Sequence, residues 1–500
     1  MSRPETNTCV YAAKVLVLGL FSAQVLATIQ VYLSNADLYL TLMVIRDAGY
    51  LPIPNERIMH RLQEFAPPFF GGLFFTLSVG AGLSILSLAA AWIWDRVLFR
   101  NKVLLIVFML LWIGCIVVVN RGGFCPLVTA YFLVIPPVVW SAALRWMPAH
   151  VKQGAWVRRM VHFIPIALLA VLWTSQMDSH LFSDIRDHLL LSNATGTKVN
   201  DFYYKYTLYP AEVFKSLDQK MLKTCSIENI GKQSTMPYLE RGLLNHDYLT
   251  VTGDATVDLR ITQEDSVLVF ENEEGAILRA PVQAFVSRPG AVLKEFSQKS
   301  DRYAFFRQFT FFSLLIGVPI TLYIFLYTVL CFVLRLFLGS MTSSVIASLF
   351  CLLLGIALLG HLHYNRERKI DVKSVADTLE SECWQDRVAA LKFIRENGLD
   401  VGDFQGYKGM LKSPHIAERY WLARVLGVSR QPETYQDLLG FLDDPHPNVV
   451  SMAFYALGQR GDMRAIREIR ERIERSDDWY NQWYAYKALR ALGWKQSRLR

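Results

Sequence analysis

The sequence predicts a multi-domain protein, in which a polytopic α-helical membrane protein carries a small α+β soluble domain and a C-terminal α-solenoid. Seven apolar runs are each long enough to cross a bilayer, a polar stretch with strand-like alternation follows the fifth run, and a 31-residue pattern repeats after the last one. The predicted parts are a five-helix membrane region at 1–177, the α+β domain at 178–308, two further membrane helices at 309–362 and the repeats at 363–500.

Composition supports membrane insertion. The chain has 500 residues, of which 52% are hydrophobic, and it is therefore too long for one core and too apolar for an ordinary soluble enzyme. A formal net charge of +8 would suit nucleic acid in a soluble protein, but here the basic residues lie beside the apolar runs, where they orient helices in a bilayer. We therefore expect the lipid bilayer, and no nucleic acid, as a partner.

The apolar runs set the membrane region. A bilayer core about 30 Å thick needs roughly 20 apolar residues in a helix, because a helix satisfies its own backbone hydrogen bonds there. The seven runs are 15–33, 69–94, 103–120, 126–144, 161–177, 309–337 and 343–362, of which the fifth is the shortest. A signal peptide is the alternative interpretation of the first run, because Lys14 precedes it and Ser22, Ala23 and Ala27 resemble a cleavage region.

Short loops indicate the orientation. Basic residues gather after the second and fourth runs, which places both loops in the cytoplasm: Arg96, Arg100, Lys102, Arg145, Lys152, Arg158 and Arg159. Two runs separate the α+β domain from the repeats, so both lie on one face, and the loop rule makes that face extracytoplasmic. Arg366, Arg368 and Lys369 after the last run favour the opposite orientation. Compact loops without targeting motifs suggest a bacterial inner membrane.

The residue pattern of the middle segment predicts a helix followed by a meander of β-strands. Ser179 or Ser183 caps a helix that runs to about Leu191. Alternating apolar residues predict strands at 257–261, 267–270, 276–278 and 282–286, and a helix from about Val292 leads into the sixth run.

One group in that first helix has the chemistry of a metal site. His180, Asp184 and His188 are spaced by four residues and share a helical face, and imidazole and carboxylate groups suit zinc or another transition metal. The alternative is an amphipathic helix with a wet polar side. No nucleotide or nucleophile motif accompanies the group, and we expect no cofactor.

The repeats carry the clearest periodicity. Five residues recur 31 positions later in the same order, which suits stacked helix pairs, and about four units fill 371–494. They are Leu411, Pro414, His415, Leu426 and Gly427, followed by Leu442, Pro445, His446, Leu457 and Gly458. We expect the histidines to begin equivalent helices and Gly427, Gly458 and Gly493 to end them.

At these residues the segment resembles HEAT-like repeats, particularly the short phycobilin-lyase type in which a helix ends in Ala-Leu-Gly, as at Ala456-Leu457-Gly458. The resemblance covers the final quarter of the chain. It implies an α-solenoid that offers an extended surface to a protein partner, and it does not imply lyase activity.

The last repeat is unusually aromatic. Its aromatic residues either cap the array or form a partner-binding hot spot, and the candidates are Trp479, Tyr480, Trp483, Tyr484 and Trp494. Because no complete catalytic constellation accompanies the repeats, the sequence favours a non-enzymatic membrane scaffold or assembly factor. A transporter or permease-like subunit and a metal-dependent membrane enzyme are the alternatives.

Overall fold

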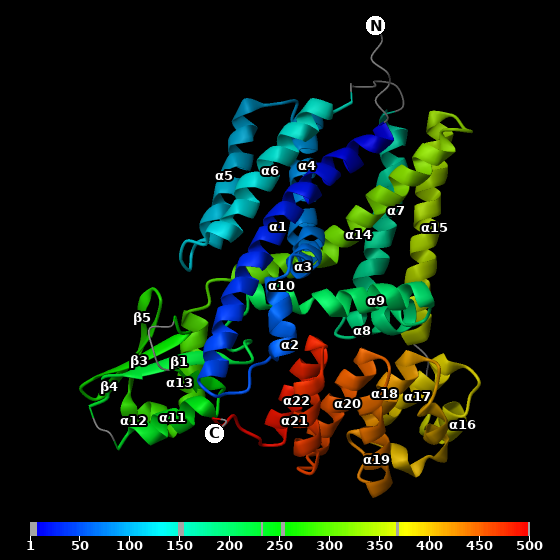
Figure 1. Ribbon diagram of the computed structural model, residues 1–500. Coiled ribbons are helices and arrows are strands. Elements are labelled where there is room, and N and C mark those ends of the chain that lie inside the picture. The colour runs from blue at the N-terminus through cyan, green and yellow to red at the C-terminus, as the bar shows by residue number, and fades with distance from the viewer. Residues whose placement is uncertain (1–7, 149–154, 232–233, 252–255, 367–369, 499–500) are drawn as a thin grey trace.

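The computed structural model describes residues 8–148, 155–231, 234–251, 256–366 and 370–498. Apolar helices form one end of the molecule, and a small sheet and the repeats lie side by side at the other end (Figure 1). This mostly helical chain with a small mixed sheet and a C-terminal repeat array confirms the coarse fold prediction.

The apolar helices follow the predicted runs. Among the described residues, six helical segments are long and apolar enough to cross a membrane: Val10–Asp47, Ala66–Arg96, Lys102–Val119, Pro126–Trp146, Ala304–Leu334 and Ser340–Arg366. The fifth run lies in α7 (Ala155–Ser175), whose apolar part, Phe163–Ser175, is shorter. The elements of the six segments are α1 (Thr8–Asp47), α3 (Ala66–Phe75), η2 (Thr76–Gly80), α4 (Ala81–Arg96), α5 (Lys102–Val119), α6 (Pro126–Trp146), α14 (Ala304–Leu334) and α15 (Ser340–Arg366).

Helix α1 continues without a break through Ala23 and Ala27, which are fully buried. It extends well beyond the predicted end of the first run and carries the chain to α2 (Glu56–Met59) and η1 (His60–Gln63) beside the repeats (Figure 1).

The basic loops lie at the end of the helices that is remote from the repeats (Figure 1). The Arg96 guanidinium donates a hydrogen bond to the Pro148 carbonyl, which brings the loops after α4 and α6 together. Lys152, Arg368 and Lys369 lie outside the described residues, as do the side chains of Arg158 and Arg159.

The middle segment contains a mixed sheet of order β2-β1-β3-β4-β5. Strand β1 pairs in parallel with β2 and β3, whereas β3, β4 and β5 form the antiparallel meander that the alternation predicted. The strands are β1 (Lys223–Glu228), β2 (Tyr248–Thr250), β3 (Leu259–Glu264), β4 (Val267–Asn272) and β5 (Gly275–Pro281). The helices are α8 (Leu181–Ile185), η3 (Arg186–Leu190), α9 (Ala194–Tyr206), α10 (Leu208–Val213), α11 (Met236–Leu244), α12 (Val282–Ser287) and α13 (Pro289–Lys299).

The strand predicted at 282–286 is wrong, because this segment is helix α12. The alternation of Val282, Ala284 and Val286 suggested a strand, but Phe285 is the residue that enters the core, and its ring lies 5.7 Å from that of Phe270. Val286 is 42% exposed, so the alternating residues do not share a buried face. The helix from Val292 is confirmed as α13, which begins three residues earlier.

The repeats stack as predicted. Helices α17, α18, α20 and α22 form one layer, and shorter helices cover them. The elements are η4 (Val372–Ser374), α16 (Val375–Leu379), α17 (Trp384–Glu396), η5 (Val401–Asp403), η6 (Gln405–Met410), α18 (Ile416–Leu426), α19 (Pro432–Gly440), η7 (Phe441–Asp443), α20 (Pro447–Arg460), α21 (Ala465–Arg475) and α22 (Trp479–Ala491).

The prediction that glycines end the repeat helices is confirmed for Gly427 and Gly493 and is wrong for Gly458. Gly427 and Gly493 follow helix ends, but Gly458 lies inside α20, which ends at Gly461 in a left-handed conformation. A Cβ added to Gly427 would lie 2.7 Å from the Ala456 Cα, and one added to Gly458 would lie 2.9 Å from the Ala488 Cα. Gly427 and Gly458 therefore allow successive repeat helices to approach closely.

We expect Gly458→Ala to destabilise the solenoid by about 1–3 kcal/mol, because the added methyl group meets backbone that cannot move freely. The matched control is Gly440→Ala, since Gly440 has helical dihedral angles and an added Cβ would have no neighbour within 4 Å. That control should be neutral or stabilising by up to about 1 kcal/mol, as glycine costs stability in helices. Thermal unfolding of the full chain in detergent compares the two variants, and equal effects would contradict this role for Gly458.

Candidate functional site

The solenoid docks onto the rest of the chain along the starts of α17, α18, α20 and α22, which we call its inner helices; α19 and α21 are its outer helices. Helices α8 and α9 lie above the inner helices (Figure 1). His415 is the N-cap residue of α18 and His446 that of α20, which confirms that the two histidines begin equivalent helices. The His446 side chain also accepts a hydrogen bond from the Asn448 amide.

The proposed metal-binding residues lie in this docking region. His180 is exposed at the start of α8, whereas Asp184 and His188 are 3% and 4% exposed. The Asp184 carboxylate accepts from the Arg366 Nε at 2.8 Å and the Lys392 Nζ at 3.2 Å. Among the described residues, no group of three or more His, Cys, Asp or Glu side chains is placed to hold a metal ion. This arrangement gives the metal interpretation no support, because two cations already hold the carboxylate.

Asp187, which the sequence did not single out, is the centre of this region. It is fully buried, and it accepts hydrogen bonds from the Arg186 Nη2 and the Trp421 Nε1, both at 2.7 Å. Arg186 in turn lies 3.8 Å from the centre of the Tyr420 ring. Burial by itself would raise the pKa of Asp187, but Arg186 and Lys392 lower that pKa below its ordinary value. The π-helical turn η3 thus inserts an ion pair into the solenoid.

His188 lies beside this ion pair, and neither of its ring nitrogens forms a hydrogen bond with a described residue. Its ring stacks on Trp384 at 6.3 Å, and Trp384 stacks on His415 at 5.3 Å. Burial, and then the positive charge of Lys392, lowers the pKa of His188 to about 4, against the raising effect of Asp187 and Asp184. His188 is therefore neutral at physiological pH.

This pKa predicts a dependence of stability on pH. Because the folded-state pKa lies below the ordinary value of 6.5, the unfolded chain takes up the proton first as the pH falls. The contribution of neutral His188 to the free energy of unfolding is fully present above pH 6.5. It is lost as the pH falls toward 4, which lowers the free energy of unfolding by about 2–3 kcal/mol. In denaturant titrations, His188→Phe should lose less stability than the wild type over this range. His60→Phe, at an exposed position, should follow the wild type, and a wild-type slope in His188→Phe would refute the prediction.

Helix α9 extends the docking region along the array. The Asn200 Nδ2 donates to the Asn448 Oδ1 at 3.3 Å, and both residues are buried. The His446 Nε2 lies 3.1 Å from the Asp201 Oδ1. Helix α9 of the middle segment therefore contacts the start of α20 through two neighbouring side chains.

The predicted aromatic hot spot faces inward. Trp479 is 7% exposed and packs edge-on against Tyr209 of α10 at 5.0 Å, and the Tyr480 ring lies 4.7 Å from Tyr204 of α9. Trp483 and Tyr484 are half-buried beside Tyr480, while Trp494 packs on Tyr486. Trp479 and Tyr480 therefore dock the solenoid onto the chain's own α10 and α9, and partner binding by the cluster stays a prediction.

A second contact region joins the solenoid to the sheet and to the segment after α1. Asp247, before β2, accepts from the Tyr486 hydroxyl at 2.6 Å and forms an ion pair with Arg490 at 3.1 Å. The buried Asn55 donates through its Nδ2 to the carbonyls of Ile473 and Ser476, both at 2.9 Å. The repeat array is therefore held by contacts from three regions: the helices α8 to α10, the sheet and the segment after α1.

Comparison with known families identifies the array. Residues 407–490 match the family model of HEAT repeats. The solenoid is built of HEAT repeats. No curated protein and no solved structure gives a significant match to this chain. HEAT repeats are generally surfaces for protein interaction, and part of this HEAT surface is occupied by the chain itself.

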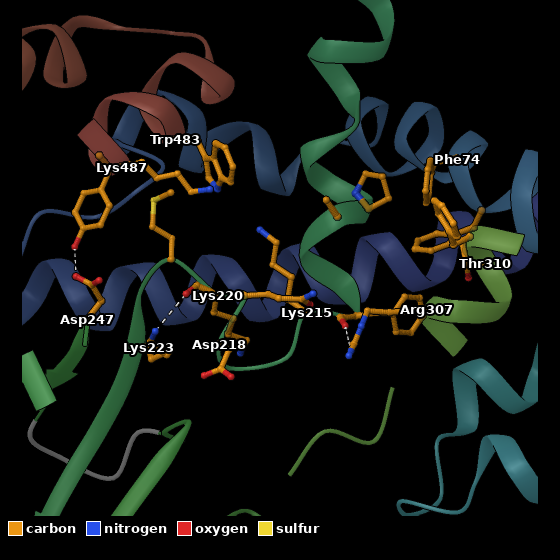
Figure 2. A pocket seen from close by; sticks show the side chains of 18 of the residues that line it. Phe74, Lys215, Asp218, Lys220, Lys223, Asp247, Arg307, Thr310, Trp483 and Lys487 are labelled. Carbon is orange, nitrogen blue, oxygen red and sulfur yellow. Dashed lines mark hydrogen bonds between the residues drawn. The ribbon is translucent and has the colours of Figure 1, made fainter. Parts of the chain in front are cut away.

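A cavity of about 690 Å³ lies where the apolar helices, the middle segment and the HEAT repeats meet (Figure 2). We call it the junction cavity. Six basic residues line it, and they come from segments far apart in the sequence: Lys215, Lys220, Lys223, Arg307, Lys487 and Arg490. No local sequence pattern marks these residues, because they come from separate segments that only folding brings together.

Proposed function

We propose that this chain is an integral membrane scaffold or assembly factor that holds a protein partner on the outer helices of its HEAT repeats. The observation that carries the proposal is the docking of the inner repeat helices onto the chain's own α8, α9 and α10. The polar faces of α19 and α21 are exposed, at Glu433 and Gln436 on one and Arg467 and Glu471 on the other. We call these four positions the outer face. Because it is charged, partner binding should weaken with salt.

The test replaces all four outer-face residues with alanine and compares the copurifying proteins of the full-length chain. A matched control replaces four exposed polar residues of another helix, α13: Lys294, Glu295, Gln298 and Lys299. The proposal requires a stoichiometric partner that the outer-face variant loses and the control variant keeps. A full set of partners retained by the outer-face variant would refute it.

Membrane insertion is the second component of the proposal. We propose that α7 and the six long apolar segments cross a bacterial inner membrane, with the sheet and the HEAT repeats on its extracytoplasmic face. The length and apolar surface of the helices support insertion, and the basic loops at their remote end support this orientation. As part of the same proposal, the chain is divided into membrane helices at 1–177 and 309–362, an α+β domain at 178–308 and the repeat domain at 363–500.

Paired cysteine substitutions test this orientation. Met463, in the HEAT repeats, is 70% exposed, and Phe99, in the loop after α4, is 80% exposed. With an impermeant thiol reagent on intact spheroplasts, the proposal expects labelling of Met463→Cys and protection of Phe99→Cys. The reverse pattern would place the HEAT repeats in the cytoplasm. Extraction of the protein by alkaline carbonate would reject insertion itself.

A further inference from the structure

The junction cavity has an apolar end and a basic end. Phe74 from α3, together with Phe311 and Leu314 from α14, contributes aromatic and aliphatic surface. Lysines from the segment after α10 and from α22 contribute charge. Figure 2 shows Lys487 and Trp483 at one end, Phe74 and Thr310 at the other, and Lys215 and Lys220 between them. A ligand that fills this space must itself be amphiphilic.

The apolar end is continuous with the outer surface of α14. Phe311 lines the cavity and is 49% exposed, and Phe312 and Ile316 on the same helix are 59% and 55% exposed. Since α14 is one of the helices long and apolar enough to cross a membrane, this surface faces lipid in the inserted protein. An acyl or prenyl chain can reach the cavity from the bilayer without passing through water.

Charge at the basic end is incompletely neutralised. Lys220 pairs with Asp258 at 2.6 Å, Arg307 pairs with Asp301, and Lys215 pairs with Glu212. Lys223 and Lys487, in contrast, form no ion pair with any described carboxylate, and their ammonium groups lie over the rings of Tyr248 and Trp483, at 4.9 and 3.4 Å. Asp218 and Asp247 also line the cavity, and Asp247 pairs with Arg490. Lys223 and Lys487 therefore lack a direct ion pair among the described residues, although Asp247 and Asp218 attract the Lys223 ammonium electrostatically.

Burial is the main cause of the lowered pKa of both lysines, and for Lys223 the carboxylates of Asp247, Asp218 and Asp258 act in the opposite direction. Burial lowers the pKa of Lys223, which is 7% exposed, and burial followed by repulsion from Lys215 lowers the pKa of Lys487. A bound anion would reverse both shifts, because a nearby negative charge favours the ammonium form.

We propose that the junction cavity binds a membrane amphiphile with a phosphate-bearing head, the head lying between Lys215 and Lys487 and the chain lying along Phe74, Phe311 and Leu314. Lysine ammonium groups are point charges that suit a phosphate without demanding one geometry. A volume of about 690 Å³ is far larger than a free phosphate ion needs and falls in the range of drug-sized ligand and cofactor sites, which is enough for the head and the adjoining part of a chain. The inference rests on the membrane insertion proposed above and is independent of the protein partner.

Native mass spectrometry of the full-length protein in detergent tests the proposal with three probes. Dioleoyl phosphatidic acid has the head and the chains, dioleoyl phosphatidylcholine has the same chains with a zwitterionic head, and glycerol phosphate has the head without chains. We expect binding of phosphatidic acid at least about tenfold tighter than that of either other probe, which corresponds to one charge-assisted interaction. Equal binding of the two lipids would overturn recognition of the head, and equal binding of glycerol phosphate would assign the cavity to a soluble phosphate.

Two variants locate the binding. Lys487→Gln should weaken phosphatidic acid binding by about tenfold, since it removes one charged donor. The matched control Lys408→Gln, at a half-exposed lysine elsewhere in the HEAT repeats, should leave binding unchanged. Leu314→Trp should fill the apolar end and reduce phosphatidic acid binding without changing that of glycerol phosphate. Equal effects of Lys487→Gln and Lys408→Gln would overturn the proposal. Carbonate extraction of the same protein separates this result from a failure of membrane insertion.

Discussion

Replacing Asp187 with alanine should detach the HEAT repeats from the membrane-proximal helices and cost about 3–5 kcal/mol of stability. The carboxylate is fully buried, so its removal leaves the Arg186 guanidinium, itself only 9% exposed, without its counter-ion. The Trp421 Nε1 loses its acceptor in the same step. Hydrogen exchange of the full-length protein in detergent should show faster exchange in η3 and α18.

The control for this prediction is Asp443→Ala. Asp443 also pairs with an arginine, Arg472, at 2.9 Å, but its side chain is 72% exposed. An exposed pair contributes at most about 1 kcal/mol, so exchange in α18 should hardly change. A similar effect of both substitutions would show that burial of Asp187 does not determine its contribution.

Trp479→Ala is expected to cost about 3–5 kcal/mol, because a nearly buried indole is removed from the contact between α22 and α10. The loss should appear as faster exchange in α22 and α10, with the strands of the sheet unaffected. Tyr238→Ala, which removes an aromatic ring that is 63% exposed on α11, should change stability by no more than about 0.5 kcal/mol.

The same variant separates the two interpretations of the aromatic cluster. If Trp479 acts in docking, Trp479→Ala perturbs α22 in the isolated protein. If it acts as a partner-binding hot spot, the isolated protein keeps wild-type exchange and a copurifying partner is lost. The second outcome would contradict the inward packing that we describe.

Much of the chain could be predicted because its signals are local. A helix that crosses a bilayer needs its own run of apolar residues, and each such run is visible in the sequence by itself. The repeats are equally visible, since two successive units place a histidine, leucines and a glycine at the same positions, 31 residues apart. The antiparallel meander β3–β5 also follows from local alternation, which a half-buried strand imposes on its own residues.

The errors arose where a side chain's environment comes from elsewhere in the chain. Val282, Ala284 and Val286 alternate like a strand, but the core that receives Phe285 belongs to β4. The three residues of strand β2 are too few to show a period, and the strand exists because β1 pairs with it. No local pattern shows that the Asp184 carboxylate accepts from Arg366 and Lys392, 182 and 208 positions later, and the metal site stays a prediction that these contacts do not support.

The sequence by itself therefore determined the apolar helices, the strand meander and the HEAT solenoid, because each depends on the periodicity of neighbouring residues. The tertiary structure decided which solenoid face is covered, why Gly458 must be glycine, and that lysines from α22 and from the segment after α10 share one cavity with α3 and α14. These features depend on contacts between separate segments, some in neighbouring repeats and others hundreds of residues apart, and no pattern within one segment specifies its partner.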